Sequence, residues 1–97
     1  MGRKNHFIEV IRANKEILKN RFGVKSLSLF GSVARDDDKA ESDLDIFVEM
    51  PPKIFIIMEM EDFLQNLLEC KIDIVRKREY MNPLLLNEIK RDGIRIF

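Results

Sequence analysis

Three aspartates occupy predicted strand positions, where this residue type is disfavoured. Asp43 and Asp45 stand two residues apart in the strand predicted over residues 42–50, so their side chains share one face of it. Carboxylates this close repel each other when both are ionised, and a divalent cation is the simplest way to offset that repulsion. Mg²⁺ takes one or two carboxylates and completes its octahedron with water and phosphate oxygens. The spacing therefore predicts a magnesium site at the start of this strand.

Asp73 supplies a third carboxylate from the middle of the strand predicted over residues 72–75. Its apolar neighbours point to the opposite face, so all three acids converge if this strand pairs beside the preceding one. An ion pair with Lys71 or Arg76 is the competing interpretation of Asp73, and the residues alone do not decide between the two.

Gly31 and Ser32 end a predicted strand and open a short polar segment with one or two helical turns. Backbone N–H groups and a hydroxyl at the positive end of a helix form a seat for phosphate. Asp43 and Asp45 follow 12 and 14 residues after Gly31, which predicts a phosphate cradle facing the metal site. Arg35 lies within one turn of Ser32 and could also bind nucleotide phosphate. An ion pair with Asp43 or with the acidic loop is its alternative.

The segment around these residues is strongly acidic, although the whole chain has no net charge. Six carboxylates and one lysine lie between residues 36 and 45. Turn regions collect Asp, and runs of charge generally face water. We therefore interpret the first four carboxylates as a solvated loop: Asp36, Asp37, Asp38 and Glu41.

Hydrophobic periodicity predicts the elements that must position these residues. A helix over residues 4–22 ends at Gly23, and alternating strands follow over 24–30, 42–50 and 72–75. Pro51 and Pro52 open a helix that ends near residue 69, Asn82 caps another that ends near residue 91, and a short strand covers 94–97. This order predicts a small α/β or α+β sheet domain over residues 1–97.

The helix before residue 69 has a predicted apolar side made of Ile54, Ile57, Met58, Leu64, Leu67 and Leu68. Phe55, Ile56 and Met60 fall off this stripe, where a partner protein or a second copy of the chain could cover them. For each of these three residues taken alone, we favour burial in the core as the interpretation.

Length and composition exclude several classes of protein. Ninety-seven residues leave room for one compact core and no separate substrate-recognition domain. Zero net charge gives no field for nucleic acid or an anionic membrane, and the basic run 76–78 is too short for an RNA-binding patch. The longest strictly apolar run, 54–58, cannot span a bilayer. The single Cys70 fits a reducing compartment, so we expect a soluble, cytoplasmic protein.

The run GSVARDDDKAESDLDIFVE, residues 31–49, resembles the nucleotidyltransferase signature of the polymerase-β-type superfamily. That signature is Gly-Ser, a helix with an Arg, and Asp-x-Asp opening the next strand. The short chain and its Ser-Asp-Leu-Asp-Ile form are similar to the minimal nucleotidyltransferases, which are often paired with a HEPN-domain toxin. Asp36 stands where many members have Gly. The resemblance implies a mixed sheet with flanking helices.

The resemblance also implies roles for the residues of the site. Gly31 and Ser32 would bind the phosphates of a nucleotide. Asp43, Asp45 and Asp73 would hold two Mg²⁺ ions, which can clamp both the attacking and the leaving oxygens of a phosphoryl transfer. Asp43 and Asp45 would bridge the ion on the triphosphate, and Asp73 would help to activate the acceptor hydroxyl.

The implied reaction transfers AMP from ATP to a hydroxyl, here that of a tyrosine on a HEPN toxin, so that the chain acts as an antitoxin. Two alternatives stay open: a non-catalytic antitoxin that occludes its partner, and an enzyme that modifies a small molecule such as an aminoglycoside. The residues do not identify a side chain that would read the nucleobase.

Overall fold

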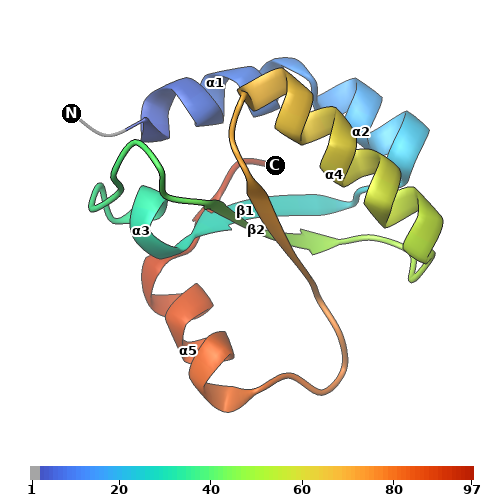
Figure 1. Cartoon of the computed structure of the whole chain (residues 1–97). Helices are drawn as coiled ribbons and strands as arrows, with labels where there is room; N and C mark the ends of the chain where they lie inside the picture. The colour runs from blue at the N-terminus through green and yellow to red at the C-terminus, as the bar shows by residue number, and fades with distance from the viewer. Residues whose placement is uncertain (1–2) are drawn as a thin grey trace.

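The computed structural model describes residues 3–97 and shows one mixed sheet with helices on both faces (Figure 1). Its elements are α1 (Lys4–Ala13), α2 (Lys15–Phe22), β1 (Ser26–Phe30), α3 (Gly31–Ala34), β2 (Leu44–Glu49), α4 (Ile54–Leu68), β3 (Ile72–Arg76), α5 (Pro83–Asp92) and β4 (Ile94–Arg95). The strand order is β3-β2-β1-β4. β2 is antiparallel to β1 and parallel to β3, and β4 is antiparallel to β1. The predicted α/β class and the mixed sheet are confirmed.

The first predicted helix is two helices, because Asn14 interrupts it. Its side-chain Nδ2 donates to the Val10 carbonyl at 2.8 Å, and its backbone leaves the helical region at φ −105° and ψ 15°. Asparagine side chains compete for backbone groups in this way and favour helix ends over helix interiors. The predicted end at Gly23 is confirmed: Gly23 has a left-handed φ of 72°, and the Val24 N–H closes the turn onto the Leu18 carbonyl at 3.1 Å.

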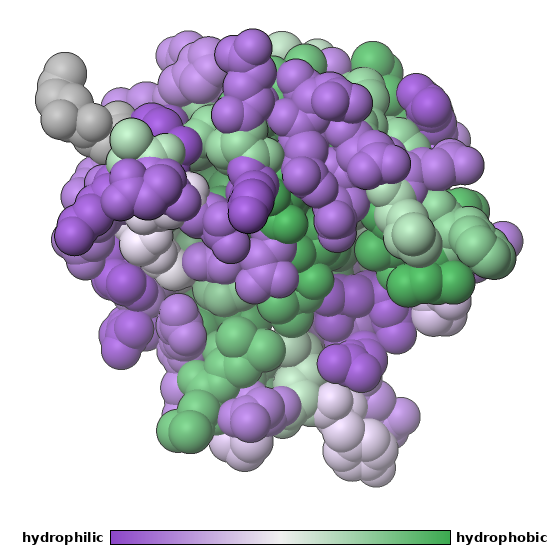
Figure 2. Space-filling model, viewed as in Figure 1, coloured by the Kyte–Doolittle hydropathy of each residue, from purple (hydrophilic) through white to green (hydrophobic). Residues whose placement is uncertain are grey.

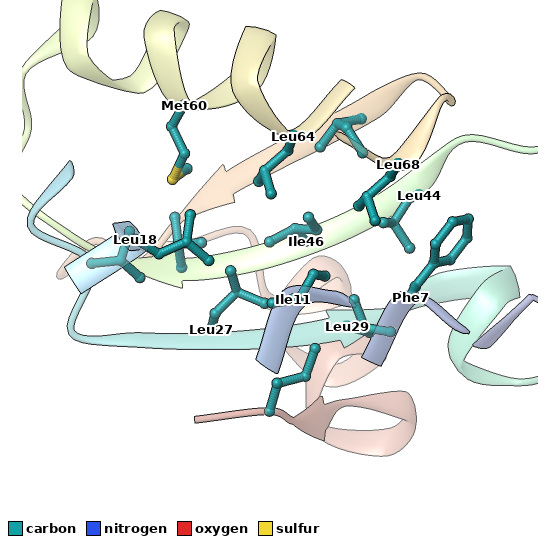
Figure 3. Close-up of a cluster of buried hydrophobic side chains, with 14 of the residues drawn as sticks. Phe7, Ile11, Leu18, Leu27, Leu29, Leu44, Ile46, Met60, Leu64 and Leu68 are labelled. Carbon is teal, nitrogen blue, oxygen red and sulfur yellow. The ribbon is translucent and has the colours of Figure 1, made fainter. Parts of the chain in front are cut away.

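The main core lies between the sheet and the layer formed by α1, α2 and α4 (Figures 1 and 3). Strand β2 alternates strictly, with Leu44, Ile46 and Val48 buried under this layer and the intervening residues half-buried on the other face. This is the period of two that a half-covered strand requires. Because of this alternation, Asp45 lies on the face of β2 that points away from the main core.

Helix α4 packs through part of the predicted stripe. Leu64 and Leu68 are buried as predicted, and Met60 joins them, so the expected core burial of Met60 is confirmed although it was placed off the main stripe. Ile54 and Met58 of the predicted stripe are exposed and form, with Phe55, an apolar patch over the start of α4 (Figure 2). The first turns of α4 are apolar on every side, so periodicity alone does not select the buried face there. The buried face is the one on which Met60, Leu64 and Leu68 follow at a spacing of four residues. Within residues 3–97 no helix is long and apolar enough to cross a membrane.

Helix α5 lies alone on the opposite face of the sheet (Figure 1) and packs against β1 and α3. Its start is as predicted, since the Asn82 side chain accepts a hydrogen bond from the Leu84 N–H at 2.8 Å and Pro83 is the first helical residue. Phe30 and Ile89 are buried outside the main core. The rest of this face is left to polar and half-buried side chains, and the predicted site lies there.

Candidate active site

Asp45 and Asp73 are register partners in the parallel strands β2 and β3. Asp45 is half-buried in an inner strand, with Phe30 of β1 as its partner on the other side. Asp73 is exposed, because β3 is the outer strand of the sheet. Register partners on one face lie within contact distance of each other. The structure thus brings together two of the three predicted carboxylates.

The pKa of Asp45 is raised to about 6. Burial is the largest cause, because it disfavours the charged carboxylate, and the negative charge of Asp73 is the next. Smaller contributions come from the charges of Glu88 and Asp43 and from a side-chain hydrogen bond with Asp73. Near neutral pH this carboxyl is therefore poised to bind either a proton or a cation.

Two further carboxylates act on Asp45 through their charge. Glu88, half-buried on α5, raises the pKa of Asp45 more than Asp43 does, although Asp43 is only two residues away. Asp43 is exposed and precedes β2. Within residues 3–97 no three His, Cys, Asp or Glu side chains form a ready-made metal-binding group, and Asp43 stands beside the Asp45–Asp73 pair, outside β2. Sequence analysis missed Glu88, because a glutamate in an amphipathic helix is typical of a solvent-facing position.

Gly31 lies directly against the Asp45 carboxylate. Its φ is +74°, a left-handed conformation that favours glycine, and a Cβ added here would overlap Asp45 Oδ2 and lie 3.0 Å from its Cγ. Gly31 is buried, and Ser32 beside it is half-buried. Helix α3 has only four residues, so close approach of the backbone, more than a helix dipole, makes this turn suited to an anionic ligand. The predicted Gly-Ser turn therefore adjoins the carboxylate pair.

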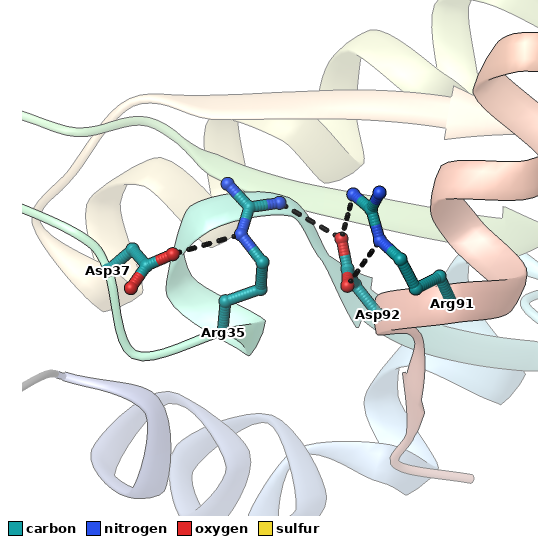
Figure 4. Close-up of polar contacts among 4 residues, drawn as sticks. All are labelled: Arg35, Asp37, Arg91 and Asp92. Carbon is teal, nitrogen blue, oxygen red and sulfur yellow. Dashed lines mark hydrogen bonds and ion pairs between the residues drawn. The ribbon is translucent and has the colours of Figure 1, made fainter.

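Arg35 bridges the acidic loop and the last residue of α5 (Figure 4). Its Nε donates to Asp37 Oδ2 at 3.1 Å, and a terminal nitrogen donates to Asp92 Oδ2 at 2.9 Å. These hydrogen bonds, that to Asp92 first, raise the pKa of Arg35. The ion pair expected between Arg35 and the acidic loop is present, and it is made to Asp37, not to Asp43.

Asp92 anchors this network. It accepts two hydrogen bonds from Arg91, at 3.0 and 2.9 Å, in addition to the one from Arg35. The Arg91 hydrogen bond is the main cause that lowers the pKa of Asp92 to about 2, against the opposing effect of burial and with further help from Arg35. The carboxylate therefore stays charged at neutral pH and holds the end of α5 against α3.

Asp36 has a left-handed backbone with φ 61°, and its side chain pairs with Lys4 of α1 at 2.9 Å. Asp is among the few non-glycine residues that tolerate this region. This conformation explains why many members of the resembled superfamily have Gly where this chain has Asp36, because a glycine adopts it without strain. Asp36 and Asp37 remain largely exposed, as expected of a solvated loop.

Asp38 does not belong to that solvated loop, and its assignment there was wrong. Its side chain is only 2% exposed and accepts a hydrogen bond from Arg3 Nε at 3.0 Å. Burial alone would raise the pKa of Asp38, but hydrogen bonds from Arg3 and from its own backbone N–H hold it below its usual value. Arg3 also donates to the carbonyls of Lys39 and Ser42. The loop that leads to Asp43 is thus fastened to the start of α1.

Comparison with known proteins identifies the family of this chain. The model for the nucleotidyltransferase domain matches residues 11–96. The chain belongs to that family. It is 38% identical over 90 residues to MJ1217 of Methanocaldococcus jannaschii, named as a candidate protein adenylyltransferase, covering 91% of this chain and 92% of that one. It is 37% identical over 70 residues to protein adenylyltransferase MntA of Thermococcus cleftensis, covering 70% of this chain and 71% of that one.

Solved structures agree with the family. A structure described as that of a candidate minimal nucleotidyltransferase is 32% identical and superposes with a TM-score of 0.70, covering 90% of this chain and 93% of that one. The fold also matches a chain in the structure of a tri-AMPylated Shewanella oneidensis HEPN toxin with its MNT antitoxin, at a TM-score of 0.61 and 22% identity, covering 90% and 70% of the two chains. The resemblance to the minimal nucleotidyltransferases is confirmed.

Replacing Gly31 by Ala tests the turn against Asp45. We expect Gly31→Ala to lose about 1–2 kcal/mol of stability from its left-handed backbone. It should also abolish nucleotidyl transfer, because the new methyl group displaces the Asp45 carboxylate. Gly23→Ala is the matched control, since φ is +72° there and the nearest atoms belong to Pro51. Thermal melts and transfer assays on both variants check this, and retained transfer in Gly31→Ala would contradict it.

Replacing Asp45 by Asn tests the cost of an ionised carboxylate that is half-buried and faces other negative charges. The folded-state pKa of about 6 lies above the unfolded value near 3.8, so ionised Asp45 destabilises the fold above pH 6, and that penalty fades as the pH falls toward 4. In metal-free buffer at pH 8 we expect Asp45→Asn to raise stability by about 1 kcal/mol after solvent screening, or roughly 4–8 °C in Tm. The gain should shrink at pH 4.5. Asp62→Asn, at an exposed position of α4, should change nothing, and an equal Tm for Asp45→Asn and wild type at pH 8 would refute the account.

Proposed function

We propose that this nucleotidyltransferase transfers AMP from ATP to a side-chain hydroxyl of a partner protein, a tyrosine of a HEPN-domain toxin, and so acts as an antitoxin. The observation that carries the proposal is the pairing of Asp45 with Asp73 across β2 and β3, next to the Gly31 turn. The identity with proteins named as protein adenylyltransferases supports the nature of the acceptor.

The Gly31–Ser32 turn would bind the triphosphate. At Gly31 the backbone can approach a ligand closely because no side chain intervenes, and the Ser32 hydroxyl and backbone N–H groups are the donors that phosphate oxygens need. Arg35 uses two of its N–H donors on Asp37 and Asp92, and a guanidinium carries five. Its remaining donors would face the negative charge that a triphosphate brings.

The carboxylates fit Mg²⁺ by their chemistry. Oxygen ligands suit this ion. Asp45 and Asp73 repel each other when both are ionised, and a bound cation would offset that repulsion, as a proton on Asp45 otherwise does. Asp45 and Asp73, joined by the neighbouring Asp43, would hold two ions. When bound, these neutralise charge on the attacking and leaving oxygens of an in-line displacement.

The transfer itself is a substitution at the α-phosphorus of ATP. The acceptor hydroxyl oxygen forms a bond to that phosphorus, and the bond to the bridging oxygen breaks, which releases pyrophosphate. Asp73 orients the acceptor hydroxyl, either as a metal ligand or as the base that takes its proton. Asp73 suits this role because it is exposed on the outer strand β3, where a large acceptor can reach it.

Transfer of label from ATP tests the proposal directly. The protein is mixed with α-³²P-labelled ATP, Mg²⁺ and a folded HEPN-domain partner, and the labelled residue is mapped by mass spectrometry. We expect label on a tyrosine of the partner. Asp45→Asn and Asp73→Asn should lower the rate by at least about 100-fold, the scale on which loss of an electrostatic catalytic group acts. Asp62→Asn on α4 should transfer at the wild-type rate.

The outcomes separate the competing functions. Neutralisation of the toxin by Asp45→Asn as efficiently as by wild type, with no labelled protein in either sample, would contradict the catalytic role and support occlusion. Label on a free aminoglycoside, with none on the partner, would contradict the protein acceptor but leave the nucleotidyl transfer intact.

A further inference from the structure

A cavity of about 390 Å³ opens on the same face of the sheet as Asp45. Phe47 of β2, Met81 of the loop before α5, and Leu86 and Ile89 of α5 give it a largely apolar lining. The charged residues of the lining are mostly basic: Lys77, Arg78 and Lys90, with the acidic Glu79. None of these residues belongs to the Asp45–Asp73 pair or to the Gly31 turn.

The strand register places this cavity immediately beside the carboxylate pair. One cross-strand row holds Phe30, Asp45 and Asp73, and the next row on the same face holds Ser28, Phe47 and Val75. Successive same-face rows are about 7 Å apart, which is two residues of a strand. An acidic row is therefore followed by a row with an aromatic side chain, and residues of α5 line the cavity together with that side chain.

The cavity and the Gly31 turn lie on opposite sides of Asp45. Since Phe30 pairs with Asp45 in antiparallel strands, the next residue of β1, Gly31, continues toward the start of β2, whereas Phe47 lies further along β2. The order along the face is turn, carboxylates, cavity. A nucleoside triphosphate has the same order of parts: polyphosphate, reacting α-phosphorus, and nucleoside.

We propose that the cavity over Phe47 binds the nucleobase of the nucleoside triphosphate, with the ring stacked on Phe47 against Leu86 and Ile89. This inference rests on the proposed function. A flat aromatic ring on an anionic chain matches a largely apolar lining with basic side chains among it. Asp73 is exposed on the outer strand, so a protein acceptor can reach it from solvent while the nucleoside occupies the cavity.

Comparison of ATP with inorganic tripolyphosphate isolates the contribution of the nucleoside. Both ligands are titrated into the full chain with Mg²⁺ by calorimetry. We expect wild type to bind ATP at least about tenfold more tightly than tripolyphosphate, as base stacking on an aromatic side chain allows. Phe47→Ala should remove most of that ratio and leave tripolyphosphate affinity unchanged. Phe55→Ala is the control, because Phe55 is 78% exposed on α4.

A second variant and a second probe cover the case in which Phe47→Ala does not fold. Phe47→Leu keeps apolar bulk but loses the ring, and 2-aminopurine riboside triphosphate reports stacking by quenching of its fluorescence. We expect quenching in wild type and in Phe55→Ala, and its loss in Phe47→Leu. Folding of each variant is checked by its thermal melt.

Four results would overturn the inference. They are equal affinities of wild type for ATP and tripolyphosphate, an unchanged affinity ratio in Phe47→Ala, unchanged quenching in Phe47→Leu, and a Phe47→Ala enzyme that binds ATP normally but transfers slowly to its acceptor. The last result would assign the cavity to the acceptor. All four leave the proposed nucleotidyl transfer standing, whereas failure of wild type to bind either ligand with Mg²⁺ would overturn both.

Discussion

Repulsion between Asp45 and Asp73 is the constraint on which the rest of the site depends. The β2–β3 register holds the backbones of these two residues opposite each other. Half-burial of Asp45 strengthens the effect, since water screens the charges less. A folded protein retains such an arrangement at a cost to its stability, and under the proposed function a cation-bound phosphate ligand would relieve it.

The neighbouring elements maintain this arrangement from three sides. Gly31 removes the side chain that would otherwise displace the Asp45 carboxylate. Asp92 fastens the end of α5 to Arg35, just after α3, so the turn and the helix above the face are held together. Arg3 fastens the loop that leads to Asp43. Each contact joins segments that are apart in the sequence: Gly31 and Asp45, Arg35 and Asp92, and Arg3 and the loop before Asp43.

The part of the site that depends on local pattern could be predicted from the sequence. Strand alternation placed Asp45 on the open face, and a strand order with β3 beside β2 brought Asp73 to it. Glu88 and Asp38 could not be found in this way, because their environment is created by the packing of α5 and by Arg3, which is 35 residues away from Asp38. The buried face of α4 was ambiguous for a related reason: its first turns are apolar on every side, and only the sheet selects among them. The role proposed for Phe47 depends on the cavity that it lines together with α5, and the sequence does not show that packing.

We propose that a cation-bound nucleotide relieves the repulsion between Asp45 and Asp73. Carbon-13 NMR titration of the aspartate carboxyl groups measures this directly, first in metal-free protein and then with Mg²⁺ and a non-hydrolysable ATP analogue. We expect the pKa of Asp45 to be about 6 in the metal-free protein and to fall below its ordinary value near 3.8 in the complex. Titration of Asp45 near its ordinary value in the metal-free protein, or a pKa that the nucleotide and Mg²⁺ leave unchanged, would contradict it.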